Sequence, residues 1–167
     1  MKSISKILLV ALSFLSVSCI KEKNGETTDS RYQPKEFVEV KHPDWSKNAT
    51  IYEANIRQFT PEGTFKAFEA HLPRIKAMGI DIIWLMPIHP IGVEKRKGTL
   101  GSEYSVKDYY GVNPEFGTKE DFKHLVDKIH SMGMYVIIDW VANHSSWDNQ
   151  LVKDHPDWYT KTEEGNF

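Results

Sequence analysis

Residues 64–88, TFKAFEAHLPRIKAMGIDIIWLMPI, contain a helix pattern followed directly by a strand pattern. In residues 64–79, apolar side chains recur at helical spacing: Phe65, Phe68, Leu72, Ile75 and Met78. Pro73 has no amide hydrogen to donate and should kink or restart this helix, and Gly79 suits its C-terminal end. The apolar run at 80–88 is typical of a strand covered on both faces. This stretch therefore predicts a helix that leads into a buried strand.

The same pattern occurs before and after this stretch. Residues 50–59, TIYEANIRQF, begin with strand-like alternation, and residues 134–140, MYVIIDW, form another apolar run. Thr118 is a suitable N-cap for a second helix, which ends at Gly133. The apolar face of that helix consists of Phe122, Leu125, Val126 and Ile129. Strands that alternate with amphipathic helices predict an α/β fold with parallel strands and helical crossovers.

Both a (β/α)₈ barrel and an open doubly wound sheet satisfy this order of elements. Neither GxGxxG nor GxxxxGK[ST] follows a predicted strand, which disfavours the nucleotide-binding open sheets. In either fold, ligand sites gather at the carboxyl ends of the strands. The corresponding segments of this chain are residues 86–89 and 139–144.

Residues 139–144, DWVANH, place three ligand-type side chains directly after a predicted strand. Asp139 alone could cap a turn, Asn143 could do the same, and His144 could be an ordinary surface residue. Three such groups within six residues favour a site. The Asn143 carbonyl oxygen suits a hard cation such as calcium, and His144 can donate to a ligand hydroxyl. The spacing does not match a zinc site.

The loop predicted at residues 87–117 is long enough to indicate a functional segment. It contains Tyr104, Tyr109 and Tyr110, and further aromatic residues follow the last predicted strand: Trp147, Trp158 and Tyr159. These rings could pack the loops down, or their faces could stack on a sugar ring. Together with the polar cluster, they favour a carbohydrate ligand.

The first nineteen residues predict an export signal. A basic segment, MKSISK, precedes an apolar run at residues 7–17 that is too short to span a bilayer. Ser18-Cys19 then resembles the lipobox of bacterial lipoproteins, which predicts lipidation at Cys19; an ordinary secretory signal is the alternative. Residues 20–36 are polar and predict a disordered tether, and the folded domain is expected at 37–167. We expect a lipid-anchored periplasmic or cell-surface protein, or otherwise a secreted one.

Net charge limits the partners. The formal net charge is −2 and the chain has no long basic run, which argues against a nucleic-acid binder. Membrane contact is expected only through the N-terminal lipid anchor.

Three segments together resemble the α-amylase family, glycoside hydrolase family thirteen. They are IKAMGIDIIWLMPI at 75–88, GSEYSVKDYYGVNPEFGTKEDFKHLV at 101–126, and DWVANH at 139–144. The resemblance covers roughly residues 49–158. It implies the first three strands and two crossover helices of a (β/α)₈ TIM barrel. It also implies a retaining hydrolase that acts on α-glucans such as starch and maltooligosaccharides.

The resemblance also implies residue roles. Tyr104 matches a tyrosine that stacks on the sugar before the cleaved bond, and His144 matches a histidine that hydrogen-bonds the same sugar. Asn143 matches a calcium ligand of many members, and Asp139 matches an aspartate that supports the active-site network without reacting.

No catalytic residue is assigned, because no carboxylate of this chain matches the family's nucleophile or acid/base. A retaining glycosidase needs two carboxyl groups about 5 Å apart, and the family's lie on later strands, beyond residue 167. We therefore expect an N-terminal barrel portion that is inactive alone and poorly soluble, because a three-stranded sheet exposes an edge and an apolar face. The alternatives are a non-catalytic α-glucan-binding surface lipoprotein and an amylase-family transglycosylase.

Overall fold

The computed structural model describes residues 40–167, of which His42–Phe167 form one compact unit. The predicted signal peptide, the predicted lipidation site Cys19 and the predicted tether at 20–36 lie outside the described residues. No helix within the described range is long and apolar enough to cross a membrane.

The centre of the compact unit is a parallel sheet of three strands in the order β1-β2-β3. The strands are β1 (Ile51–Ala54), β2 (Ile82–Leu85) and β3 (Tyr135–Ile138). In the register, Ala54 pairs with Leu85 and Leu85 pairs with Ile138, so all three strands end in one row. The predicted α/β class and the predicted parallel pairing are therefore confirmed.

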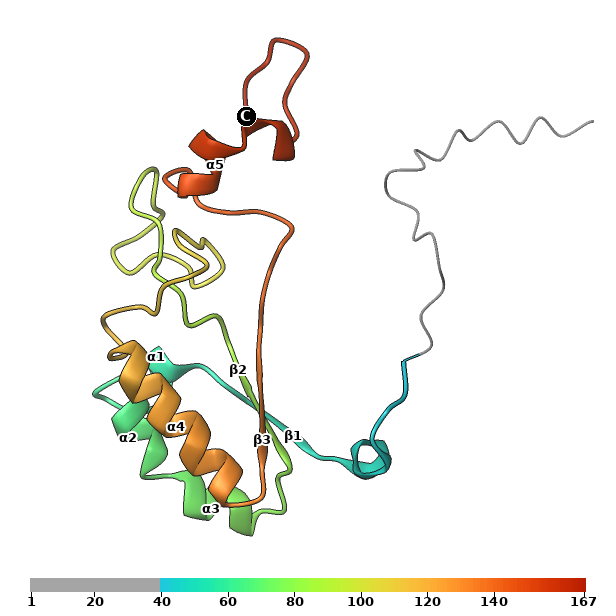
Figure 1. Cartoon of the computed structure of the whole chain (residues 1–167). Coiled ribbons are helices and arrows are strands. Elements are labelled where there is room, and N and C mark those ends of the chain that lie inside the picture. Colours follow the sequence, from blue (N-terminus) through green and yellow to red (C-terminus); the bar gives the residue numbers. More distant parts are fainter. Residues whose placement is uncertain (1–39) are drawn as a thin grey trace, which may run out of the picture. The chain divides into compact units, whose positions relative to one another are not determined.

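The helices lie between and after the strands, and Figure 1 shows α2, α3 and α4 along one side of the sheet. Their bounds are α1 (Ile56–Phe59), α2 (Phe65–Glu69), α3 (Leu72–Ala77), α4 (Lys119–Ser131) and α5 (Gln150–Asp154), with 3-10 turns η1 (Asp44–Asn48) and η2 (Pro156–Trp158). The helix predicted at 64–79 is broken in two, and Pro73 lies in the first turn of α3, where a missing amide costs nothing. Gly79 follows α3 with φ +81°, which confirms its predicted role as a stop.

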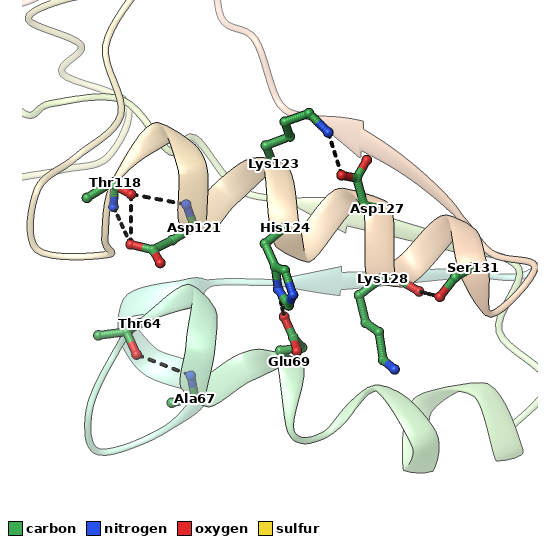
Figure 2. A network of polar contacts seen from close by, with 10 residues as sticks. All are labelled: Thr64, Ala67, Glu69, Thr118, Asp121, Lys123, His124, Asp127, Lys128 and Ser131. Atoms are coloured by element: carbon green, nitrogen blue, oxygen red, sulfur yellow. Dashed lines mark hydrogen bonds and ion pairs between the residues drawn. The ribbon is translucent and has the colours of Figure 1, made fainter.

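Side-chain caps fix where two of these helices begin (Figure 2). The Thr64 hydroxyl accepts from the Ala67 amide at 3.2 Å at the start of α2. The predicted N-cap Thr118 forms a reciprocal capping box with Asp121 at the start of α4. Farther along, His124 of α4 lies 2.8 Å from a carboxylate oxygen of Glu69 in α2, which joins the outer surfaces of the two helices.

The core lies between the helices and one face of the sheet. Its fully buried side chains include Phe65, Phe68, Leu72, Ile75, Ile83, Leu85, Leu125 and Ile129. Met78, expected in the apolar stripe, is 53% exposed, because it is the C-cap of α3 and lies past the last helical turn that packs on the sheet. The strand-like alternation predicted at the start of 50–59 corresponds to β1, after which the chain turns into α1 directly after Asn55.

The expectation that the later strands are covered on both faces is wrong for β3. Ile137 is 43% exposed and Tyr135 is 43% exposed, because the helices of the described chain pack on the opposite face of the sheet. Trp45 stacks on Tyr135 at 3.9 Å between ring centroids and covers part of this surface. The expectation that a three-stranded sheet leaves an apolar face exposed is thus confirmed.

Candidate functional site at the carboxyl edge of the sheet

The three parallel strands deliver their next residues to one edge of the sheet. The Met86 amide donates to the Ala54 carbonyl at 3.0 Å, and the Asp139 amide donates to the Leu85 carbonyl at 2.8 Å. The ladder therefore continues one residue beyond the ends of β2 and β3. Asn55, after β1, and Asp139, after β3, consequently emerge at the same carboxyl edge, where ligand sites of parallel sheets form.

Tyr104 reaches this edge from the long loop. Its hydroxyl donates to Oδ2 of Asp139 at 2.9 Å, so two of the predicted site residues are in contact. Burial raises the pKa of Tyr104 to about 12, together with the hydrogen bond to Asp139 and the charges of Asp139, Glu53 and Glu103. The phenol therefore keeps its proton at neutral pH and remains a donor to Asp139.

A buried ion pair beside Tyr104 was not predicted from the sequence. Glu103 is only 7% exposed, and its Oε1 lies 2.7 Å from Nη2 of Arg57. Asn55 Nδ2 donates to the same oxygen at 3.0 Å. A glutamate in a long polar loop is ordinarily solvated, so its residue type gave no signal. The only hint was the position of Arg57, close behind a predicted strand end.

His144 and Asn143 lie on the segment that follows β3, and both are exposed. Asn143 Nδ2 and His144 Nδ1 are 3.2 Å apart. The Tyr109 hydroxyl holds this segment in place, since it lies 2.9 Å from the Val141 carbonyl oxygen and 2.7 Å from that of His144. Burial raises the pKa of Tyr109, with a smaller contribution from Tyr159, so this phenol also stays a donor.

A pocket of about 660 Å³ opens beside this segment. Its walls are rich in aromatic side chains and include Tyr109, Tyr110, Trp140, Asn143, His144, Trp147, Trp158 and Tyr159. Trp158 is 64% exposed and stacks one face on His155 with 3.9 Å between the ring centroids, which leaves much of the ring accessible. Tyr104 and Asp139 are not among the lining residues. The predicted site is therefore divided into an edge contact, Tyr104–Asp139, and an aromatic pocket that contains His144 and Asn143.

The long loop at 87–117 is held by specific contacts. The buried His89 donates from Nδ1 to the Gly111 carbonyl at 2.9 Å, which fixes the ring tautomer. Asp148, from the segment after β3, accepts from the Val93 amide at 3.0 Å and lies 3.4 Å from Lys107 Nζ. The loop and the pocket wall are thus joined through Asp148.

The carboxyl group of Asp148 makes the free energy of unfolding depend on pH. Burial acts to raise the pKa of its carboxyl, but hydrogen bonding, with the Val93 amide first, outweighs it and lowers the pKa to about 2, from an ordinary 3.8. Because the folded-state pKa is depressed, the stabilisation is complete above pH 4 or so and is lost as the pH falls through about 2.

We expect Asp148→Asn to lower the free energy of unfolding at pH 7 by about 2 kcal/mol. The difference from wild type should shrink as the pH falls from about 4 toward 2, because the wild-type carboxylate is then protonated too. Urea unfolding at several pH values measures this. Asp157→Asn, on the exposed turn η2, is the control and should change stability by less than about 0.5 kcal/mol. A difference that is independent of pH would contradict the prediction.

The residues around Asn143 do not by themselves fit a calcium ion. Calcium takes six to eight oxygen ligands, and Asn143 offers one side-chain oxygen. Within residues 40–167, no group of three or more His, Cys, Asp or Glu side chains could hold a metal ion. No chemical step is therefore assigned to calcium.

Comparison with known proteins gives consistent matches. The family model described as "Alpha amylase, catalytic domain" matches residues 23–166. A crystal structure of an alpha-amylase from Lactobacillus plantarum is 48% identical with TM-score 0.70, over 72% of this chain and 28% of that one. A noncanonic maltogenic alpha-amylase from Thermotoga neapolitana is 51% identical with TM-score 0.68, over 72% and 29%.

A curated relative, alpha-1,4-glucan:maltose-1-phosphate maltosyltransferase 1 from Streptomyces coelicolor, is 35% identical over 122 residues. That alignment covers 65% of this chain and 18% of the relative. The chain thus spans about a fifth of the length of this curated relative and less than a third of the two solved chains.

Proposed function

The chain belongs to the alpha-amylase catalytic-domain family, and on that premise we propose that it forms part of a retaining hydrolase of α-glucans such as starch and maltooligosaccharides. Its three parallel strands and covering helices are consistent with part of a (β/α)₈ barrel. The observation that best supports the proposal is the 2.9 Å hydrogen bond between Tyr104 and Asp139 at the carboxyl edge of the sheet. In this fold, substrates bind at that edge.

The proposed roles follow from what each side chain can offer. With its hydroxyl fixed on Asp139, the Tyr104 ring has one orientation and can present a face to a sugar. His144 is exposed in the aromatic pocket and can donate to a sugar hydroxyl. Asp139 supports Tyr104 by accepting the hydrogen bond of its hydroxyl on Oδ2, and the resemblance to the family assigns it no reacting role.

Hydrolysis is favoured over glycosyl transfer by the degree of similarity. The two solved amylases are 48% and 51% identical to this chain, whereas the Streptomyces coelicolor maltosyltransferase is 35% identical. The transferase remains the second candidate because of that relative's name. The third candidate is a non-catalytic glucan binder. It is supported by the contacts of the two carboxylates nearest Tyr104, because Asp139 accepts from Tyr104 and Glu103 is ion-paired with Arg57.

Binding of maltoheptaose to the purified 167-residue chain tests the proposal. We expect calorimetric titration to give a dissociation constant on the order of 1 mM and His144→Ala to weaken it about tenfold, which is the value of one lost hydrogen bond in a site. His130→Ala, on the exposed surface of α4, is the matched control and should bind as wild type does. Equal binding by wild type and His144→Ala would contradict the assigned role of His144.

Analysis of the sugars after the same incubation distinguishes the reactions. Shorter products indicate hydrolysis, and longer products indicate transfer. For the 167-residue chain alone we expect neither, because no carboxylate of this chain matches the family's nucleophile or acid/base, and a retaining mechanism needs two such groups about 5 Å apart.

Two further proposals rest on the sequence. We propose that Cys19 is lipidated and anchors an exported protein; metabolic labelling with a palmitate analogue, lost in Cys19→Ala, tests this. We also propose that the exposed Asn143 contributes one oxygen ligand to a calcium ion in the whole enzyme. Equilibrium dialysis against radioactive calcium, with Asn143→Ala as the comparison, tests that assignment.

A further inference from the structure

The loop segment directly before Tyr104 is held by a single guanidinium group. Arg57 lies in α1, just after β1, and its Nη2 lies 2.7 Å from the carboxylate of Glu103. Its two terminal nitrogens also donate to the Gly101 carbonyl at 3.3 Å, and Nη1 donates to that of Leu100 at 3.3 Å. Arg57 therefore binds residues 100–103 at several points at once.

Glu103 is the charged partner that makes this arrangement stable. Its side chain is 10% exposed and that of Arg57 is 16% exposed, so neither charge can be satisfied by water alone. Asn55 adds a second donor to Oε1 of Glu103 at 3.0 Å. Because Asn55 and Arg57 both follow β1, the carboxylate ties the loop to the carboxyl end of that strand.

Tyr104, the next residue in the chain, makes a contact at the carboxyl end of β3. Tyr104 follows Glu103 directly, and its hydroxyl donates to Asp139 after β3. Two consecutive residues thus connect the end of the first strand with the end of the third. We propose that Glu103 is a positioning residue, which fixes the loop on Arg57 and thereby keeps the Tyr104 hydroxyl on Asp139. The inference deepens the proposed function, on which the sugar-contacting role of Tyr104 rests.

Glu103 could instead act on Tyr104 through charge alone, and Glu53 separates these two possibilities. The charges of Glu53 and Glu103 both raise the pKa of Tyr104, and the contribution of Glu53 is the larger of the two. Glu53 is exposed on β1, whereas Glu103 is bound to Arg57 and Asn55. A charge effect predicts that Glu53→Gln changes Tyr104 at least as much as Glu103→Gln, and a positioning effect predicts the reverse order.

The experiment follows the Tyr104 phenol by NMR in the 167-residue chain with ¹³C-labelled tyrosine, assigned with Tyr104→Phe. With a pKa of about 12, wild-type Tyr104 should be almost fully protonated at pH 10.5. In Glu103→Gln the freed, solvated phenol should titrate near its ordinary value of about 10 and be roughly half ionised or more at that pH. In Glu53→Gln it should stay mostly protonated.

The proposal is overturned if Tyr104 in Glu103→Gln titrates as in wild type, or if Glu53→Gln ionises it to the same extent. If Glu103→Gln does not fold, as judged by circular dichroism at pH 7, Arg57→Lys replaces it. That variant keeps the positive charge but loses the fork that holds residues 100–103, and it should also release Tyr104. The titration needs no sugar, so its outcome is independent of whether the chain binds maltoheptaose.

Discussion

Replacing Arg57 with methionine is expected to lower the free energy of unfolding by about 3–5 kcal/mol, because it leaves the Glu103 carboxylate buried without its counter-charge. Glu103 is 7% exposed and would keep only the Asn55 amide as a partner. Urea unfolding followed by circular dichroism measures the loss.

A surface ion pair provides the matched control. Lys47 and Asp44 are 3.0 Å apart, but their side chains are 69% and 96% exposed, and such pairs contribute between zero and about 1 kcal/mol. Lys47→Met should therefore leave stability nearly unchanged. The double variant Arg57→Met/Glu103→Gln should recover much of the lost stability, since it removes the uncompensated charge as well. A cost for Arg57→Met no larger than that for Lys47→Met would show that the buried pair is not needed for folding.

Phe68→Ala is expected to have an effect of similar size for a different reason. Phe68 in α2 is completely buried, and its ring packs edge-on against Phe59 with centroids 4.7 Å apart. Truncating such a ring leaves a cavity and costs about 3–5 kcal/mol, a large part of the 5–15 kcal/mol that is typical of whole domains. Thermal unfolding should show a strongly lowered midpoint or no cooperative transition.

Tyr110→Ala is the control for this second prediction. Tyr110 carries a ring of similar size but is 81% exposed, so its removal should change the free energy of unfolding by less than about 0.5 kcal/mol. If Phe68→Ala melted close to wild type, the cluster beneath α2 would not be the centre of the core.

The sequence predicted the local structure well where one residue type has one physical consequence. Pro73 cannot donate in a helix interior, and the helix restarts there. Thr118 caps α4 with Asp121 as its partner. The row of strand ends also followed from the pattern, and with it the common location of Asp139 and the long loop.

Contacts between distant parts of the chain were beyond the sequence pattern. The burial of Glu103 depends on Asn55 and Arg57, which lie 48 and 46 residues earlier in the chain, before α2, α3 and β2. The exposure of Ile137 depends on which face of the sheet the helices cover. The apolar sequence of β3 does not show whether one face of the strand is covered or both. For the site, the resemblance predicted Tyr104 and Asp139 but not that they touch. The roles of all four residues, Tyr104, Asp139, His144 and Asn143, stay predictions.

Asp139 is attached to the sheet, whereas the pocket wall is attached to a side chain of the long loop. This difference affects which of the two can change its sequence without loss of stability. The Asp139 amide belongs to the sheet's own ladder, so a substitution that shifts this backbone would also weaken the sheet. The pocket wall at residues 142–144 is exposed and is held through the Tyr109 phenol. Substitutions in that wall can therefore change the ligand preference at little cost in stability, whereas substitutions that shift the Asp139 backbone also cost sheet stability.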